Sequence, residues 1–404
     1  MKSILALLLL WITFFDQPIR ETILSNPTHA GTTPRFTTDQ RGNPVLSWAE
    51  KTSDKAAVFF FSVSTDGGET FGAAMRIPVP ADLSTHAEGM PKIAIKGNGT
   101  LIALFEVAHP TTESPYAGNL YTMTSTNNGQ SWTDPKPVHR DVTPGKSHSF
   151  GDLTRLPNGE VGLVWIDEKL NGQEGRCIKF VQTQPQGGFS PEIIVDSNAC
   201  QCCRTNVFID SKNQIHLTYR DLIPTGKSSP AARDMSRATS TDGGKTFGTP
   251  QRIYVDDWRV AACPHAGSSV AQVGNDLYTT WFSGKEGSEG VRLARAGQAD
   301  LAATVPSSRA KHPQVVAYQN QLMWLWDESV RLPNQPADEP MPKFTQRIAL
   351  RTAPTAPVTY LTSQTVSATY PVALATAKGL LVAFEQKNGD QKPVIVTQLI
   401  AHPQ

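Results

Sequence analysis

Cysteine, net charge and helical periodicity are all sparse in this chain. It has five cysteines in 404 residues, and its 37 basic residues are balanced by 36 acidic ones. No basic block stands out, so nucleic acid and anionic membranes are not expected partners. Long amphipathic helical patterns are missing, whereas Gly and Pro number 30 each. This composition predicts an all-β protein rich in turns.

A hydrophobic run long enough to cross a membrane is also lacking. The longest apolar stretch covers the twelve residues from Ile4 to Phe15 and follows a single lysine, Lys2. That length is typical of a signal-peptide core and too short to span a bilayer. We interpret residues 1–20 as a signal peptide, with a buried first strand as the alternative. The mature chain is then exported to the periplasm, the cell surface or the medium, has no membrane span, and can form disulfides.

One pattern recurs seven times along the chain: an apolar strand, a turn, and a second strand that carries an aromatic residue. The copies begin at Pro34, Pro91, Gly151, Thr205, Gly267, Pro313 and Pro371. Four-stranded antiparallel units at this spacing are the signature of a β-propeller. We predict a single domain over residues 21–404, monomeric and seven-bladed, with a six-bladed propeller as the alternative. Residues Glu21–Ser25 are expected to supply the outer strand of the last blade and close the ring.

A second motif supports the propeller. Three segments share the pattern Ser-x-Asp/Asn-x-Gly-x-Ser/Thr-aromatic: Ser64–Phe71, Ser125–Trp132 and Ser240–Phe247. Asp or Asn bonds the turn backbone, Gly takes positive φ, and the aromatic residue is buried between strands. These segments resemble the Asp-boxes, or BNR repeats, of the sialidase superfamily. The resemblance implies a propeller whose Asp-boxes lie on the face opposite the ligand site.

Histidine and cysteine gather at the entrances of the blades. In a propeller, the residues before each innermost strand lie around one mouth of the axial channel. Nine of the fourteen His and Cys residues fall within five positions before a repeat: His29, His86, His148, His265, His312, Cys200, Cys202, Cys203 and Cys263. The carboxylates that end the second strands are expected on the same side: Glu50, Glu106, Asp167, Asp221, Asp327 and Glu385. Such a mixture of donors suits a soft or borderline metal, copper or zinc.

This gathering of donors leaves two interpretations of the cysteines. The leading hypothesis is a transition-metal site, structural or redox, with ligands drawn from Cys202, Cys203, Cys263, His265, His86, His148 and His312. In the other, a disulfide joins Cys263 to one of Cys200, Cys202 and Cys203, because the chain is expected in an oxidising compartment. Cys177 is expected to be a thiol of the core.

Arginines near the cysteines form a further candidate group. Arg204 follows the cysteines directly, and Arg220-Asp221 and Arg233-Asp234 belong to the same repeat. Adjacent Arg and Asp residues are commonly structural ion pairs on the surface. The alternative is a clamp of Arg204, Arg220, Asp221 and Arg233 for an anionic ligand.

The resemblance to exo-α-sialidases implies a competing, enzymatic function. That family uses three arginines on the substrate carboxylate, a Tyr nucleophile paired with Glu, and an Asp acid. Arg35 opens the first repeat, where the family carries Arg-Ile-Pro, and Tyr370 opens the last repeat at the place of the nucleophile, although Pro371 follows it. No Glu is assigned as its partner. The expected ligand is therefore a metal, a small molecule or a glycan, and a non-catalytic glycan-binding or scaffold propeller is the third possibility.

Overall fold

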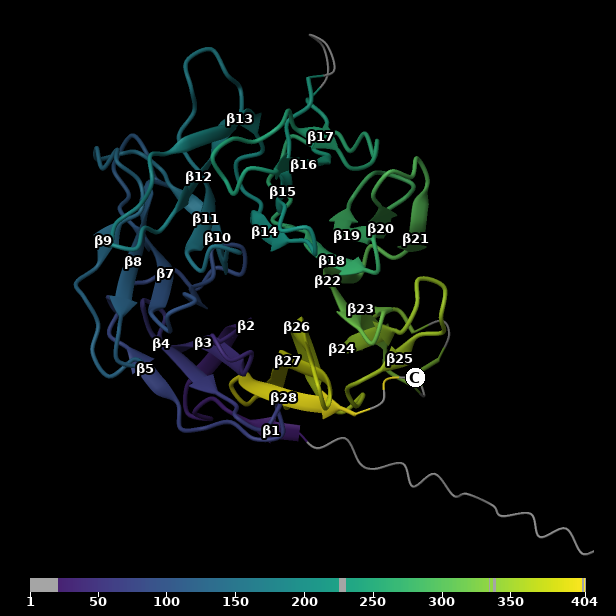
Figure 1. The fold of residues 1–404 in the computed structure, drawn as a ribbon. Coiled ribbons are helices and arrows are strands. Elements are labelled where there is room, and N and C mark those ends of the chain that lie inside the picture. Colours follow the sequence, from purple (N-terminus) through teal and green to yellow (C-terminus); the bar gives the residue numbers. More distant parts are fainter. Residues whose placement is uncertain (1–20, 225–229, 334, 337–338, 402, 404) are drawn as a thin grey trace, which may run out of the picture.

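The protein is a ring of seven sheets. The computed structural model describes residues 21–224, 230–333, 335–336, 339–401 and 403; the expected signal segment, 1–20, lies outside this range. Seven four-stranded antiparallel sheets surround one axis (Figure 1). The described residues form strands and turns only, with no helix that could cross a membrane. The predicted seven-bladed fold is confirmed, and the six-bladed alternative is excluded.

The strands of the first four blades follow the chain outward from the axis. Blade 1 is β2 (Ala30–Thr38), β3 (Pro44–Ser53), β4 (Ala56–Val63) and β5 (Met75–Ile77). Blade 2 is β6 (Lys92–Ile95), β7 (Leu101–Ala108), β8 (Gly118–Ser125) and β9 (Lys136–Pro137). Blade 3 is β10 (Ser149–Arg155), β11 (Val161–Ile166), β12 (Arg176–Gln182) and β13 (Ile193–Ala199). Blade 4 is β14 (Asn206–Ile209), β15 (Ile215–Arg220), β16 (Met235–Ser240) and β17 (Gln251–Arg252).

The last three blades complete the circle, and the final one takes its outer strand from the start of the described chain. Blade 5 is β18 (Ser269–Val273), β19 (Asp276–Ser283), β20 (Gly290–Arg295) and β21 (Leu301–Val305). Blade 6 is β22 (Ala310–Tyr318), β23 (Gln321–Arg331), β24 (Phe344–Arg351) and β25 (Thr359–Tyr360). Blade 7 is β26 (Ser367–Thr376), β27 (Gly379–Lys387), β28 (Val394–Ile400) and β1 (Glu21–Ile23). β1 pairs with β28, as expected for the segment Glu21–Ser25.

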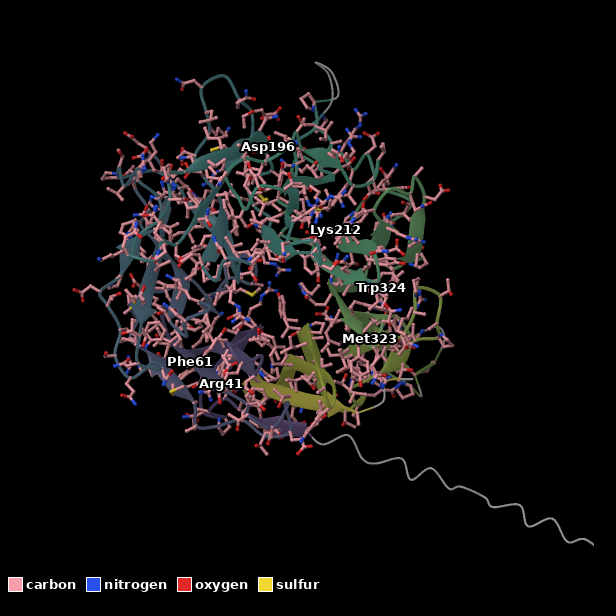
Figure 2. All side chains as sticks on the ribbon, viewed as in Figure 1. Arg41, Phe61, Asp196, Lys212, Met323 and Trp324 are labelled. Atoms are coloured by element: carbon pink, nitrogen blue, oxygen red, sulfur yellow. The ribbon has the colours of Figure 1, made fainter. Side chains whose placement is uncertain are left out.

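The recurring aromatic residue forms the core. One such side chain stands on the second strand of every blade, and each is at most 1% exposed: Trp48, Phe105, Trp165, Tyr219, Trp281, Trp326 and Phe384. The second strand is sandwiched between neighbouring blades, so both of its faces are buried. All six positions of β11 and of β15 are buried accordingly. Side chains fill the layers between blades around the ring (Figure 2, where Phe61 and Trp324 are labelled).

The Asp-boxes are the turns between the third and fourth strands of three blades. In the first, Asp66 accepts hydrogen bonds from Ser64 Oγ at 2.8 Å and from the backbone N–H of Thr70 at 3.0 Å. The bonds from Thr70 hold the pKa of Asp66 below its ordinary value. Gly68 has a φ of +99°, and a Cβ there would lie 2.9 Å from the Leu381 side chain. The box therefore fixes the turn and its contact with the neighbouring blade.

Five residues at the entrances of the innermost strands, at the ends of the blades opposite the Asp-boxes, have left-handed backbone conformations, although none is glycine. We call them the rim residues; their φ angles lie between +46° and +57°, and they are Thr33, Phe150, His265, His312 and Tyr370. All except His265 coincide with a β-bulge in the innermost strand. A bulge turns the side chain away from the sheet. The rim residues therefore present their side chains at the mouth of the channel.

Carboxylates of the preceding blade hold three of these strained positions. The backbone N–H of Thr33 donates to Glu385 at 2.9 Å, that of Phe150 to Glu106, and that of Tyr370 to Asp327 at 2.7 Å. Left-handed backbone costs about 1–2 kcal/mol in a non-glycine residue. A charge-assisted hydrogen bond in a buried site offsets that cost. Of the carboxylates expected at the mouth, Glu385, Glu106 and Asp327 therefore join one blade to the next.

Asp327 offers a test of this bonding. Its buried Oδ2 accepts from the Tyr370 N–H and from His312 Nδ1, both at 2.7 Å. Asp327→Ala is expected to lower the free energy of unfolding by about 2–4 kcal/mol, because it leaves a buried N–H without a partner. Asp276→Ala, which breaks an exposed pair with Arg295, is the matched control and should cost less than about 1 kcal/mol. Equal losses in urea unfolding would contradict the structural role of Asp327.

Candidate metal site at the mouth

The cysteine-rich segment lies where the chain enters blade 4. Residues 200–205 connect β13 to β14, and residues 253–268 connect β17 to β18 in the adjacent blade 5. Both connections lie at the rim end of the blades, opposite the Asp-boxes. The backbone N–H of Cys200 donates to the Arg220 carbonyl at 3.0 Å, which fixes the start of the segment against β15.

Five side chains there form two overlapping groups of donor atoms, which we call the Cys–His cluster. The inner group is Cys200, Cys202 and Cys203, and the outer group is Cys202, Cys263 and His265. Within each group the donor atoms lie within 4.8 Å of one another. The inner group is buried, whereas Cys263 and His265 are exposed. All five cysteines of the chain are free thiols in the structure, so the expected disulfide is not formed there.

Cationic groups stabilise negative charge on the inner sulfur atoms. Arg233 Nη1 donates to Cys200 Sγ at 2.8 Å. The Sγ atoms of Cys200 and Cys202 are 3.9 Å apart. Hydrogen bonds from the Cys202 and Cys203 thiols, followed by the charges of Arg233 and Arg220, lower the pKa of Cys200 well below its ordinary value. Burial raises the pKa of Cys203 to about 12. Cys200 is therefore the most acidic thiol of the inner group, and it is the one that Arg233 contacts.

The segment between β5 and β6 reaches over the mouth and carries His86. The His86 ring lies edge-on to the His265 ring, with centroids 4.9 Å apart, and edge-on to Phe150. Two residues along, Glu88 accepts a hydrogen bond from the Arg204 backbone N–H at 2.8 Å. Burial and the nearby His265 lower the pKa of His86. His86 is thus placed beside the outer group, although it is not a member of it.

The other two histidines expected in the metal site lie elsewhere. His148 Nδ1 contacts Asp167 at 3.0 Å, and His312 Nδ1 contacts Asp327 at 2.7 Å. His29 makes the same type of bond to Glu50. In each case the carboxylate lies in, or directly after, the second strand of the same blade, so the repeat places these histidines. The structure brings Cys202, Cys203, Cys263 and His265 together, with His86 alongside, and leaves His148 and His312 apart.

His148 also stacks on a second buried histidine, His139. The His139 and His148 rings are 3.5 Å apart and nearly parallel, and both side chains are at most 3% exposed. His139 donates through Nδ1 to the Asp141 carbonyl, while His148 faces Asp167. Burial, followed by the charge of His148, lowers the pKa of His139 to about 4.

This stack predicts an acid-sensitive fold. An unfolded histidine titrates near 6.5, so the unfolded chain takes up a proton at His139 before the folded chain does. Stability is present above that pH and is lost as the pH falls from about 6.5 to about 4, by about 3 kcal/mol. The free energy of unfolding, measured in urea at several pH values across this range, should fall less steeply with decreasing pH in His139→Gln than in wild type. The exposed His109→Gln is the control, and equal slopes in both variants would refute the assignment.

The arginines assigned as an anion clamp have partners of their own. Arg220 donates to the carbonyls of Arg233, Ala266 and Phe282, and its guanidinium stacks on Trp258. Asp221 accepts from Ser236 instead of its neighbour. The ion pairs expected between adjacent Arg and Asp residues are therefore not the contacts these side chains make. The second Arg, Arg233, bonds the Val260 carbonyl and the Cys200 thiol.

Two cationic side chains inside the channel lie close to the carboxylate of Asp152. Arg35 Nη2 lies 3.4 Å and Lys92 Nζ 3.8 Å from its Oδ1 atom, and Lys92 and Asp152 are both 1% exposed. Burial lowers the pKa of Lys92 to about 8. Lys92 and Asp152 were missed as site residues, although both occupy the second position of a repeat, as Arg35 does. Aligning the repeats by charge would have revealed them.

Tyr370 and Arg204 line a small cavity at the mouth, together with Thr33, Met90 and His312. Its volume of about 20 Å³ suffices for a water molecule. Burial, followed by the charges of Glu385 and Asp327, raises the pKa of Tyr370 to about 12. The tyrosine is therefore held in its neutral form.

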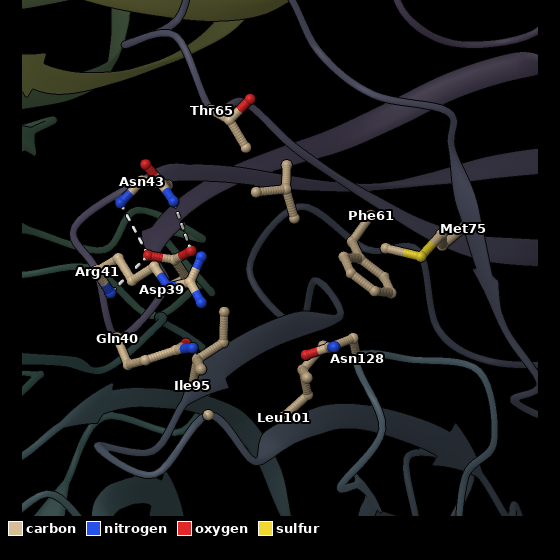
Figure 3. A pocket seen from close by; sticks show the side chains of 12 residues that line it. Asp39, Gln40, Arg41, Asn43, Phe61, Thr65, Met75, Ile95, Leu101 and Asn128 are labelled. Carbon is tan, nitrogen blue, oxygen red and sulfur yellow. Dashed lines mark hydrogen bonds between the residues drawn. The ribbon is translucent and has the colours of Figure 1, made fainter.

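Two of the larger cavities, both away from the Cys–His cluster, lie along the axis and at the Asp-box end. One of about 370 Å³ follows the axis and is lined by Arg35, Asn206, Gln314 and apolar residues of blades 4 to 7. The other, of about 240 Å³, lies between blades 1 and 2 at the Asp-box end (Figure 3). There the Asp39 carboxylate bonds the Arg41 and Asn43 backbone and fixes the turn. That pocket has no donor set comparable to the cluster.

Residues 58–382 match the model of the BNR repeat-like domain family. Three solved structures have similar folds. A protein of unknown function from Dyadobacter fermentans is 14% identical with a TM-score of 0.50, and the match covers 94% of this chain and 97% of that one. The intramolecular trans-sialidase from Ruminococcus gnavus is 8% identical with a TM-score of 0.54, covering 96% and 98%. Polysaccharide lyase Uly1 is 10% identical with a TM-score of 0.53, covering 92% and 90%.

These identities show a shared fold and leave the chemistry open. No curated protein matches the chain. The family match covers most of the chain, and the Asp-boxes and blade order agree with it. The chain therefore belongs to the BNR repeat-like domain family and is a seven-bladed propeller of the sialidase superfamily.

Proposed function

We propose that this propeller binds a thiophilic transition metal, copper or zinc, at its mouth. The observation that supports the proposal best is the outer group, in which one imidazole and two thiols from different blades converge within 4.8 Å. Thiolate and imidazole are the ligands that copper and zinc prefer in proteins. The adjoining thiols and Arg233 add donors and a compensating charge. The metal is structural or redox-active, and the chain is exported.

Metal analysis of the protein, purified reduced and reloaded with copper or zinc, tests the proposal. Wild type is expected to retain stoichiometric metal after gel filtration. The double variant Cys202→Ala/His265→Ala removes a shared and an exposed ligand and should retain none. Cys177→Ala is the matched control, because Cys177 is a buried thiol of blade 3 outside the cluster. Metal-free wild type, or equal metal in the double variant, would disprove metal binding at this place.

A sialidase-like glycosidase is the second candidate, since Arg204 and Tyr370 line one cavity at the mouth. In that mechanism Tyr370 attacks the sugar, and Arg35 and Arg204 bind a carboxylate. The raised pKa of Tyr370 and the small cavity weigh against it. Tyr370→Phe should eliminate hydrolysis of an aryl sialoside if this candidate holds, while leaving bound metal unchanged. A wild type inactive in both assays would favour a glycan-binding or scaffold propeller.

A further inference from the structure

Cys202 belongs to both donor groups of the cluster. A metal–thiolate bond is about 2.3 Å long, so two ligands of one ion lie at most about 4.6 Å apart. The donor atoms of each group lie within 4.8 Å of one another, which is close to that separation. The two groups, taken over the described residues, do not merge into one group of five. Either group can therefore coordinate one ion, while the remaining donors of the cluster lie too far away to bind that same ion.

We propose that the mouth holds two metal ions that share the Cys202 thiolate as a bridge. The inner ion is bound by Cys200, Cys202 and Cys203, and the outer ion by Cys202, Cys263 and His265. The inference rests on the proposed function, because both require the cluster to bind metal. It goes further in giving the number of ions, their separate ligands and the bridging atom.

The number of donors favours copper(I) over zinc. Each group supplies three ligands, and structural zinc almost always takes four. Soft thiolate ligands suit both copper(I) and zinc, so the number of donors decides between them. His86, beside His265, is the nearest further imidazole, and its ring is edge-on to that of His265. Three-coordinate sites therefore fit a monovalent soft ion better than a divalent one.

Charge balance points to the same ion. Cys200, Cys202, Cys203 and Cys263 carry four negative charges when all are thiolates. Two monovalent ions neutralise two of them, and the guanidinium groups of Arg233 and Arg220 neutralise the others. Arg233 bonds Cys200 directly, and the Arg220 guanidinium is buried beneath the segment. Two divalent ions would leave a net charge of plus two at a largely buried site, which is unfavourable.

The two ions differ in access to solvent. The inner ligands are all buried, with Cys202 the most exposed at 5%, whereas Cys263 and His265 are exposed. The outer ion is therefore open to exchange with an external donor or acceptor of copper(I), and the inner ion is retained. Each thiol that binds releases its proton to solvent, and copper stays in the cuprous state, so no oxidant or reductant is consumed.

The test is an anaerobic titration of the reduced full chain with copper(I) against a chromophoric copper(I) chelator. Wild type is expected to bind two copper ions per chain, with a short copper–copper distance in its X-ray absorption spectrum. Cys200→Ser should bind only the outer ion, and His265→Ala only the inner one. Cys202→Ser should lose the copper–copper feature. Cys177→Ala should still bind two ions.

The outcomes separate this inference from the proposed function. One copper ion per chain in wild type would overturn the two-ion site and leave metal binding intact. No bound copper or zinc would overturn both. Two ions without a copper–copper feature, or with that feature retained in Cys202→Ser, would overturn the bridge. Circular dichroism confirms that each variant is folded, and the single-site variants Cys200→Ser and His265→Ala test the two halves if Cys202→Ser does not fold.

Discussion

Deletion of Glu21–Ser25 is expected to lower the free energy of unfolding by about 3–5 kcal/mol and to cause aggregation. β1 pairs with β28 at Glu21, Thr22 and Ile23, opposite Gln398, Thr397 and Val396. Beyond β1, the Leu24 N–H donates to the Ile395 carbonyl at 2.9 Å, and the Ile395 N–H donates to Ser25 Oγ at 2.8 Å. Each of these bonds contributes about 1 kcal/mol, and their loss exposes an apolar strand edge.

Thermal unfolding and light scattering measure both effects. A variant in which residues 21–25 are replaced by five Gly and Ser residues keeps the chain length. Its melting temperature should fall, and its light scattering should rise, almost as much as in the deletion. Glu21→Gln, which retains the strand, should behave like wild type. An unchanged melting temperature in the deletion would show that the ring closes without β1.

Asp152→Ala is expected to destabilise the protein by about 3–5 kcal/mol, the usual cost of leaving a buried charge uncompensated. The substitution removes the anion that faces Arg35 and Lys92. It also deprives the Val207 N–H of its acceptor at 3.1 Å. The Asp152 carboxylate in blade 3 contacts residues of blades 1, 2 and 4, so its loss removes contacts between several blades at once.

Two further measurements identify the cause of that loss. Lys92→Met in the Asp152→Ala background removes the unpaired ammonium and should recover much of the stability. Burial already holds the pKa of Lys92 at about 8, below the 10.5 of an unfolded lysine. At pH 9 the variant can discharge Lys92 at small cost, so its destabilisation should be smaller there than at pH 6. A loss independent of pH, with no recovery in the double variant, would assign the effect to packing.

The blades could be predicted because the fold requires particular residue types at the repeated positions. The aromatic residue of each second strand is buried between two blades, so it recurs at the same position from Trp48 to Phe384. Asp-box turns require a glycine such as Gly68, where a Cβ would approach Leu381. Ring closure followed from the same logic, because the last repeat had one strand too few and Glu21–Ser25 was the segment left over.

The site was only partly predictable, because its contacts join residues far apart in the sequence. That the cysteines and His265 meet follows from their places before neighbouring repeats. The contact of Arg233 with Cys200 does not, since Arg233 lies 33 residues further along the chain and outside the repeated pattern. Likewise, the segment carrying His86 and Glu88 crosses the mouth, and no periodicity in the sequence encodes that path.

The rim residues have a consequence for how such a mouth changes during evolution. Glu385, Glu106 and Asp327 bind the backbone N–H of Thr33, Phe150 and Tyr370, an atom that nearly every amino acid possesses. The support of the backbone is thus independent of the side chain presented. The rim already carries a hydroxyl, a phenyl ring, two imidazoles and a phenol in one conformation. Ligand chemistry can therefore be replaced one blade at a time while the scaffold keeps its hydrogen bonds, which makes the rim a set of interchangeable positions on a constant frame.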